Sequence, residues 1–262
     1  MEDVQNSVDS RGIAIQKVGV REIHLPFRIR TKEGDFQQVL AQICFTISLP
    51  REYKGTHMSR FMEILNQWSN RPIAEPEMEA ILDEALDRLT ATSANIEIRF
   101  KYFIKKIAPV SGKASMLDLD CCFYGSKGKD SSFVFEFSVD VPATSLCPCS
   151  KSISRYGAHN QRGIMRARLR FREGSDCIYI EDLAELMEQQ ASSQLYPLLK
   201  REDEKYVTEH AYENPKFVED MLRDLVLALR DVPGLEWFSV SCENFESIHN
   251  HNAYASHEER VE

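Results

Sequence analysis

The sequence predicts an α+β protein built from two similar modules, in each of which helices lie on one face of an antiparallel sheet. Two observations support this prediction. Segments in which apolar and polar residues alternate, as in half-buried strands, flank pairs of segments with the i, i+3, i+4, i+7 spacing of amphipathic helices. The two halves also repeat nearly the same element order, ββααββ and then ββααβ, without repeating their sequence.

The first half begins after a polar, aperiodic arm at residues 1–17. Its first strand ends at a turn at 32–35, and Pro50 ends the second. Pro76 stands near the start of the second helix, where proline is tolerated. The predicted strands are 18–30, 39–48, 96–104 and 117–124, and the predicted helices are 61–68 and 78–89.

The second half follows a hairpin turn or short hinge at 125–130. Its predicted strands are 133–141, 164–171 and 235–242, and its predicted helices are 180–199, interrupted by Tyr196-Pro197, and 217–229, opened by Asn214-Pro215. We expect the first module at 18–125 and the second at 126–253. The tail at 254–262 is charged, and we expect it to be mobile.

Composition excludes several classes of function. The formal net charge of −9 disfavours broad nucleic-acid binding. No apolar run approaches the ~20 residues that span a bilayer, and the N-terminus lacks the features of a secretory signal. Seven cysteines, an odd number, fit reduced thiols in a cytoplasm better than a disulfide framework. We therefore expect a soluble cytoplasmic protein without a nucleic-acid or membrane partner.

The segment 142–162 carries the strongest chemical signal. It combines two thiols, an imidazole and three cations: Cys147, Cys149, His159, Lys151, Arg155 and Arg162. Thiolate and imidazole are good ligands for zinc and related metals. Pro148 restricts Cys147 to extended conformations, so the two thiols should point in different directions, one to a metal and the other to a substrate. The alternative is a loop with structural cysteines and a capping histidine. A closed four-ligand zinc site is disfavoured, because no second cysteine pair with zinc-site spacing exists.

Three further places carry acids or histidines. The charged run at 200–205 is most simply a solvated linker. Glu219 falls in the first turn of a predicted helix, where a carboxylate is favourable for structural reasons alone. Glu246, His249 and His251 follow the last predicted strand and form a possible site. The spacing of residues thus indicates an open metal site at Cys147 and His159 but identifies no substrate.

Five separated segments then point to a family. Residues 108–112, 147–151, 157–162, 200–205 and 244–251 together resemble the prokaryotic type IB GTP cyclohydrolase I family, in its motif order, over about residues 15–255. The resemblance implies two tunnelling-fold (T-fold) modules. It also implies a homo-oligomer, expected to be a tetramer, with purine sites at subunit interfaces.

The resemblance assigns roles residue by residue. It implies one divalent metal per site, zinc, manganese or iron, held by Cys147, His159 and Glu204, where Glu204 is preferred to Glu202 and Asp203. Glu219 would accept hydrogen bonds from N1–H and the 2-amino group of guanine. The expected triphosphate ligands are Lys151, Arg155 and Arg162, followed by Lys113 and Lys127.

The implied reaction is the hydrolysis of GTP to 7,8-dihydroneopterin triphosphate and formate, the first step of folate synthesis, with queuosine synthesis as a second pathway left open. Metal-activated water would attack C8, and His249 or His251, oriented by Glu246, would protonate N7. Cys149 would act as a proton relay or an additional ligand.

Two other functions remain open at this point. One is the T-fold nitrile reductase of queuosine synthesis, which needs NADPH and a thiolate nucleophile, Cys147 or Cys149. The metal-binding histidine and the cluster at 246–251 favour the hydrolase. The other is a non-catalytic oligomer stabilised by metal, in which the cysteines and histidines are structural.

Overall fold

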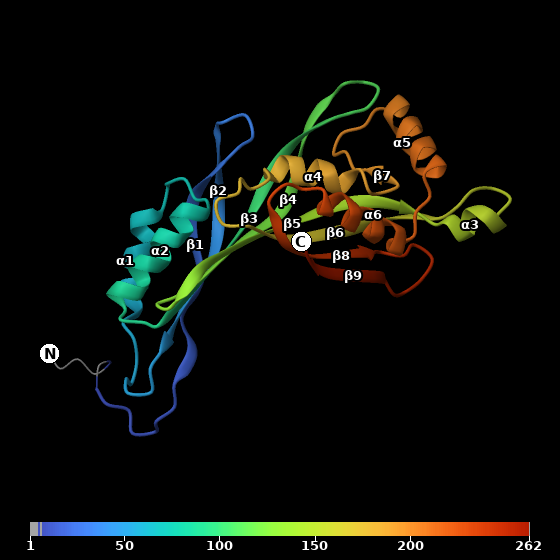
Figure 1. Ribbon diagram of the computed structural model, residues 1–262. Helices are drawn as coiled ribbons and strands as arrows, with labels where there is room; N and C mark the ends of the chain where they lie inside the picture. The colour runs from blue at the N-terminus through green and yellow to red at the C-terminus, as the bar shows by residue number, and fades with distance from the viewer. Residues whose placement is uncertain (1–4, 6, 262) are drawn as a thin grey trace. The chain divides into compact units, whose positions relative to one another are not determined.

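The computed structural model describes residue 5 and residues 7–261. This part of the chain contains both strands and helices (Figure 1). In order, the elements are β1 (Ile15–Arg30), β2 (Phe36–Leu49), α1 (Met58–Trp68), α2 (Glu75–Arg88), β3 (Ser93–Ile107), β4 (Ala114–Gly128), β5 (Ser131–Leu146), α3 (Pro148–Ile153), β6 (Asn160–Phe171), α4 (Ile180–Glu188), β7 (Ser193–Gln194), α5 (Arg201–Glu213), α6 (Val218–Arg230), β8 (Leu235–Asn244) and β9 (Ala253–Arg260).

The chain forms two compact units. Unit 1 extends to Lys101 and includes Cys122–Phe137, and unit 2 comprises Tyr102–Cys121 and the chain from Ser138 onward. Strands β3, β4 and β5 each contribute residues to both units. The sequence places a module boundary at residues 125 and 126. In the structure the chain instead passes between units three times, each time inside a strand.

In unit 1 the strands lie in the order β1-β2-β3-β4-β5, with antiparallel pairing of β1 with β2 and of β2 with β3. Helices α1 and α2 pack against each other and cover one face of these strands (Figure 1). Phe61 of α1 meets Phe45 of β2 edge to face, with ring centroids 5.2 Å apart. Alternate residues of β2 are buried on this face, which explains why period two predicts the strand correctly.

In unit 2 the strand order is β3-β4-β5-β6-β8-β9, and the short β7 pairs with β5. Helices α4 and α6 lie on these strands (Figure 1) and bury apolar stripes that include Leu183, Met187 and Leu225. Facing them, β8 buries Phe238, Val240 and Cys242 at alternate positions, and the buried side chains form the core of unit 2. Burial raises the pKa of the Cys242 thiol to about 12, so this cysteine is a core residue.

The predicted α+β class, with antiparallel strands and helices on one face, is confirmed. So is the ββααββ order of the first half. In the stretch at 125–130, residues 125–128 still belong to β4, and Lys129 and Asp130 form the turn before β5 begins at Ser131.

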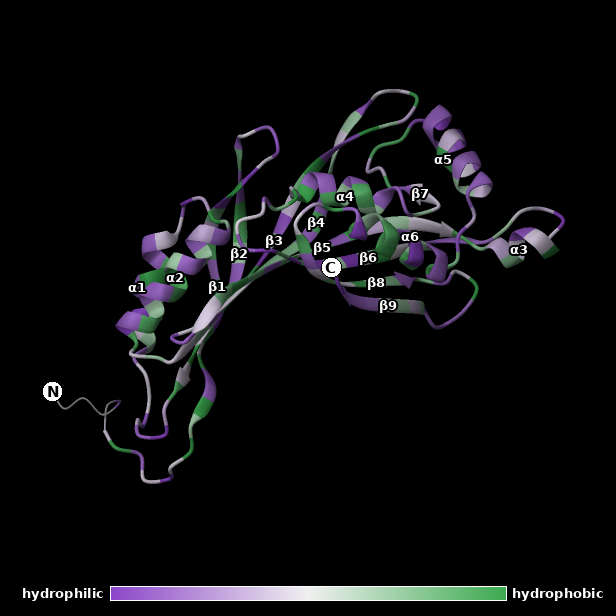
Figure 2. Cartoon of the chain, viewed as in Figure 1, coloured by the Kyte–Doolittle hydropathy of each residue, from purple (hydrophilic) through white to green (hydrophobic). Residues whose placement is uncertain are grey.

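Two predictions between residues 180 and 205 are wrong. The expected helix 180–199 ends at Glu188, and residues 193–194 instead form β7 against β5. The charged run at 200–205, interpreted as a linker, forms the first turn of α5. Figure 2 shows why composition misleads here: α5 is hydrophilic along most of its length, and only Asp203 and Ala211 are buried. The sequence of α5 therefore lacks the regularly spaced apolar residues from which a helix could be predicted.

The expectation of a mobile tail from residue 254 is also wrong, because these residues form most of β9. The strand pairs along its whole length with β8. Arg230 of α6 donates two hydrogen bonds to Glu259, both of 2.8 Å, and the Trp237 indole N–H donates to Glu258 at 3.0 Å. Because these partners are distant in sequence, the charged composition of the tail alone does not predict that it forms a strand.

Candidate active site

The loop after β5, entirely within unit 2, carries the first of the predicted site residues. Cys147 has the extended conformation expected before Pro148, with φ −69° and ψ 116°. It is the N-terminal cap of the short helix α3, and its Sγ accepts a hydrogen bond from the Ser150 amide at 3.4 Å. Cys149, one residue into α3, is exposed. The two thiols thus differ in exposure, and only the Cys147 thiol caps the helix.

Ser150 joins Cys147 to His159. Its hydroxyl donates to the Cys147 carbonyl at 3.1 Å and accepts from the His159 amide at 3.2 Å. The Cys147 amide in turn donates to the His159 carbonyl at 3.1 Å. Gly157 has a φ of 128°, which side-chain-bearing residues rarely adopt, and this lets the chain turn back toward β6. One backbone bond and two bonds of the Ser150 hydroxyl therefore hold the backbones of Cys147 and His159 close together.

Two acceptors surround Nδ1 of His159. Gln161 Oε1 lies 2.9 Å from it, and Glu246 Oε2 lies 3.8 Å away. Gln161 is buried, and its Nε2 donates to the hydroxyl of buried Ser145 at 2.6 Å. Sequence reasoning missed Gln161 and Ser145. The signal was available in principle, since residues 159 and 161 are two apart at a strand start and so share a face.

Pairing of β6 with β8 brings Glu246 to this place. Gly163 pairs with Asn244, and a Cβ on Gly163 would lie 2.7 Å from the backbone carbonyl oxygen of Glu243, so a larger residue would force the paired backbones to shift. The amide of Phe245 then donates to the carbonyl of Arg162 at 2.9 Å. Glu246 follows directly and is largely buried beside His159.

His249 and His251 lie exposed in the turn between β8 and β9, with their rings stacked and centroids 5.0 Å apart. In the described part of the chain, no hydrogen bond joins Glu246 to either ring. The neighbour of Glu246 in this structure is His159.

At the start of α5 the acidic residues divide into two kinds. Asp203 is fully buried and accepts from the amides of Val110, Ser111 and Lys200 and from the Ser111 hydroxyl, at 2.7–2.9 Å. Burial alone would raise the pKa of Asp203, but these hydrogen bonds outweigh it and hold the pKa well below its usual range. Glu204 is exposed, and in the described residues its carboxylate has no hydrogen-bond or ion-pair partner. Asp203 is thus committed to structure, and Glu204 is available.

The same division occurs at the start of α6. Asp220 caps the helix by accepting from the Phe217 amide at 3.0 Å. Glu219 is exposed, and no described residue hydrogen-bonds to its carboxylate. The capping role that could explain an acid at this position therefore belongs to Asp220.

The cations expected to hold a triphosphate differ in availability. Lys151 donates to the Tyr212 carbonyl, and its Nζ lies 4.3 Å from the centre of the Tyr212 ring. Arg155 and Arg162 are exposed. Of the weaker candidates, Lys113 is exposed, whereas Lys127 lies in unit 1 and pairs with Glu79 and Asp83.

Two of the predicted ligands have side chains of a chemistry that transition metals accept. The Cys147 thiol and His159 Nε2, the ring nitrogen not facing Gln161, suit zinc, manganese or iron. Among the described residues, no group of three or more His, Cys, Asp or Glu side chains is arranged to hold a metal ion. The structure thus brings Cys147 and His159 together and leaves Glu204 on α5.

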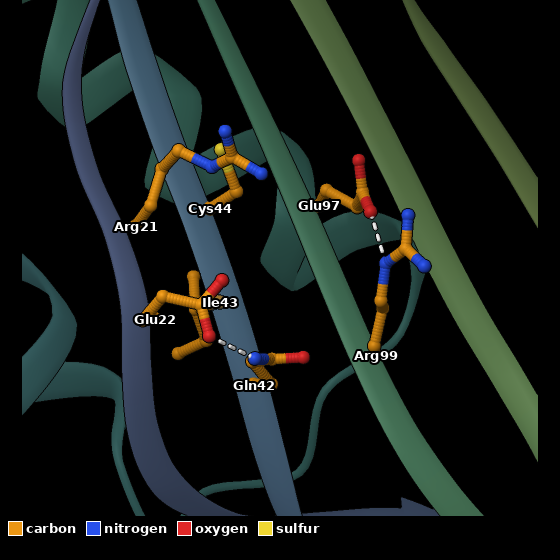
Figure 3. A pocket seen from close by; sticks show the side chains of 7 residues that line it. All are labelled: Arg21, Glu22, Gln42, Ile43, Cys44, Glu97 and Arg99. Atoms are coloured by element: carbon orange, nitrogen blue, oxygen red, sulfur yellow. Dashed lines mark hydrogen bonds and ion pairs between the residues drawn. The ribbon is translucent and has the colours of Figure 1, made fainter.

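Unit 1 has a small polar hollow of about 240 Å³ between β1, β2 and β3 (Figure 3). It is lined by Arg21, Glu22, Gln42, Ile43, Cys44, Glu97 and Arg99. Glu22 lies in a bulge of β1 with φ 58° and accepts from Gln42, and Arg99 pairs with Glu97. None of the predicted site residues lines this hollow.

Comparison with solved structures identifies the fold. Over 94% of this chain, it superposes on urate oxidase from Bacillus subtilis with a TM-score of 0.54 at 6% identity, covering 98% of that chain. Uricase from Arthrobacter globiformis gives a TM-score of 0.52 at 8% identity, with 94% of each chain covered. The protein therefore has the tunnelling fold, as the resemblance implied.

Comparison of sequences identifies the family. The family model described as "Type I GTP cyclohydrolase folE2" matches residues 1–255. GTP cyclohydrolase FolE2 of Geotalea uraniireducens (strain Rf4) is 53% identical over 98% of this chain and 92% of its own length. That of Geobacter metallireducens (strain ATCC 53774 / DSM 7210 / GS-15) is 51% identical over 98% and 96%. The chain belongs to the type I GTP cyclohydrolase FolE2 family.

Proposed function

We propose that the protein carries out the reaction of its family at the Cys147–His159 centre of unit 2. The chain is a GTP cyclohydrolase I of type IB, a hydrolase that acts on GTP. Water adds at C8 of the purine, the ring opens, and a second hydrolytic step releases C8 as formate. The ribose then rearranges and closes onto the ring nitrogens to give 7,8-dihydroneopterin triphosphate, a precursor in folate biosynthesis. The single observation that supports this location is the Ser150 bridge between Cys147 and His159.

The proposed metal ligands are Cys147, His159 and Glu204. When bound, zinc, manganese or iron would supply Lewis acidity and make water nucleophilic at neutral pH. The free carboxylate of Glu204 beside the committed Asp203 supports the choice between these neighbours. The third ligand would have to come from a movement of α5 or from a second copy of the chain.

Recognition of guanine is assigned to Glu219. Its free carboxylate can accept from N1–H and the 2-amino group together, whereas adenine presents no such pair of donors. Lys151, Arg155 and Arg162 are the proposed triphosphate ligands. Of these, Lys151 would have to leave the Tyr212 carbonyl to reach a phosphate.

Proton transfer is assigned to the histidine turn and to Cys149. His249 or His251 would donate a proton to N7 as the ring opens. Cys149, which is exposed on α3, would relay a proton near the Cys147 thiol.

We further propose a cytoplasmic homotetramer with active sites at subunit interfaces. Ile153 and Tyr156, next to the candidate site, are 84% and 92% exposed, which supports burial of this loop by another copy. In addition, no helix among the described residues is long and apolar enough to cross a membrane.

The test combines metal analysis and turnover in one preparation. Protein reconstituted with zinc, manganese or iron is incubated with GTP while formate and pterin fluorescence are measured. Equal release of formate and pterin product, dependent on metal and absent in Cys147→Ala, supports the proposal. Turnover that persists in metal-free Cys147→Ala would place the reaction elsewhere.

A further inference from the structure

The Nδ1 atom of His159 is hydrogen-bonded to a short chain of buried polar side chains. Its Nδ1 lies 2.9 Å from Gln161 Oε1, and Gln161 Nε2 lies 2.6 Å from the Ser145 hydroxyl. Gln161 is 8% exposed and Ser145 is fully buried, so water cannot readily replace either bond. Such a chain constrains the direction of the Gln161 amide and the protonation of the imidazole.

The surroundings of Nδ1 determine which nitrogen carries the proton. A neutral imidazole has one N–H donor and one acceptor nitrogen. The Glu246 carboxylate lies 3.8 Å from Nδ1 and can only accept while ionised, so it favours a proton on Nδ1. Gln161 must then present its oxygen to His159 and its NH₂ to Ser145, which is the arrangement observed. The lone pair is left on Nε2.

We propose that Gln161, itself oriented by Ser145, is the positioning residue that keeps His159 in the Nδ1–H tautomer and thereby directs Nε2 to the metal. This inference rests on the proposed function only in making His159 a metal ligand. Loss of a group that orients a ligand histidine typically lowers metal affinity 10–100-fold. We expect that range for removal of the Gln161 oxygen.

Three variants separate positioning from packing. Gln161→Leu keeps the approximate volume and removes both polar atoms. Gln161→Glu keeps an acceptor for Nδ1–H and can accept from the Ser145 hydroxyl. Gln190→Leu is the matched control, because the Gln190 amide also donates one hydrogen bond, to the Leu186 carbonyl at 2.9 Å, away from the site.

The first measurement is cobalt and zinc affinity, by competition with a chromophoric chelator and without GTP. We expect Gln161→Leu to bind 10–100-fold more weakly, and Gln161→Glu and Gln190→Leu to stay within a few-fold of the unmodified protein. If Gln161→Glu is as weak as Gln161→Leu, Gln161 donates to His159 rather than accepts from it, and the proposal is wrong. Equal affinity in all four proteins would also overturn it.

The second measurement reads the tautomer directly in metal-free protein. With ¹⁵N-labelled histidine, and His159→Gln to assign the resonance among seven histidines, the spectrum should show a protonated Nδ1 and an unprotonated Nε2. Loss of this preference in Gln161→Leu supports the proposal, and the opposite tautomer in the unmodified protein refutes it. Neither measurement needs turnover, so absence of GTP hydrolysis would count against the proposed function alone. Failure of the unmodified protein to bind either metal would overturn the metal-directing role.

Discussion

Removal of the Lys106 ammonium should strongly destabilise unit 2. Lys106 Nζ donates to both oxygens of Glu188, at 2.7 and 2.6 Å, and to Gln194 Oε1 at 2.8 Å. The two charged side chains are only 7% and 3% exposed. Lys106→Met would leave the Glu188 carboxylate buried without a counterion. Breaking a buried pair in this way costs about 3–5 kcal/mol.

That cost can be converted to a melting temperature. A loss of 1 kcal/mol lowers Tm by about 2–4 °C in a protein of comparable size, so Lys106→Met should lower Tm by roughly 6–20 °C. The control is Lys205→Met, which removes one partner of a 3.8 Å pair with Glu209 whose side chains are 73% and 61% exposed. An exposed pair of this kind contributes about 0.3–0.5 kcal/mol, so Tm should fall by at most about 2 °C.

The same variant has a predictable pH dependence. Burial raises the pKa of Glu188, and the hydrogen bond from Lys106 opposes that rise. Without Lys106 the pKa should rise further, so the folded protein holds the Glu188 proton more tightly than the unfolded chain. Stability lost at high pH is then recovered as pH falls through the raised pKa toward the ordinary glutamate value of about 4.3.

Thermal unfolding at about pH 8 and about pH 5.5 measures both effects. We expect the Tm difference between Lys106→Met and the unmodified protein to shrink at the lower pH, while the Lys205→Met difference stays small at both. A Lys106→Met loss no larger than that of the control would refute the reasoning. A loss that grows on acidification would refute the assignment of the buried charge to Glu188.

Three further predictions follow from the site. Asp203→Asn should lower stability most above about pH 4 and reduce the stability that is lost on acidification. The reason is that the lowered pKa of Asp203 stabilises the folded protein only while the pH stays above the ordinary aspartate pKa. Unfolding midpoints across acid pH measure this, and an unchanged profile contradicts it. Cys147→Ala should lose metal and activity, whereas Cys149→Ala should keep most metal and lose most turnover; equal metal loss would make both thiolates ligands. Glu219→Gln should lower GTP turnover roughly thirty- to thousand-fold, from a mismatch of about 2–4 kcal/mol, with unchanged metal content; near-normal kinetics would remove Glu219 as the guanine ligand.

The spacing of apolar residues predicted those strands and helices that bury one regular face of their own sequence. Strand β2 and helix α1 bury residues at periods of two and of three to four, and both were found. Strand β9 and helix α5 depend on partners distant in sequence instead. Glu259 is held by Arg230, and Asp203 of α5 is held by the loop at 110–111. Their own residues are polar, so periodicity could not detect them.

Some residues of the candidate site could likewise be predicted from sequence, and others could not. Cys147 and His159 lie twelve residues apart on one loop, and the nature of their side chains was enough to predict a centre. The approach of Glu246 to His159 depends on the register of β6 with β8 and on Gly163, which no short segment specifies. The role of Gln161 becomes visible only when Ser145 is seen to hold its amide.

Helix capping explains how the structure separates acidic neighbours that sequence cannot. In both α5 and α6 the third helical residue is an aspartate, Asp203 or Asp220, whose carboxylate accepts from the amide of the residue just before the helix. A carboxylate used in this way is stabilised by the helix start and cannot leave without exposing an unpaired amide. The acids beside them, Glu204 and Glu219, do not cap the helices and are exposed in the first turn. Glu204 and Glu219 therefore have no capping role: the positive end of the helix dipole favours their charge, and their carboxylates stay available to a ligand.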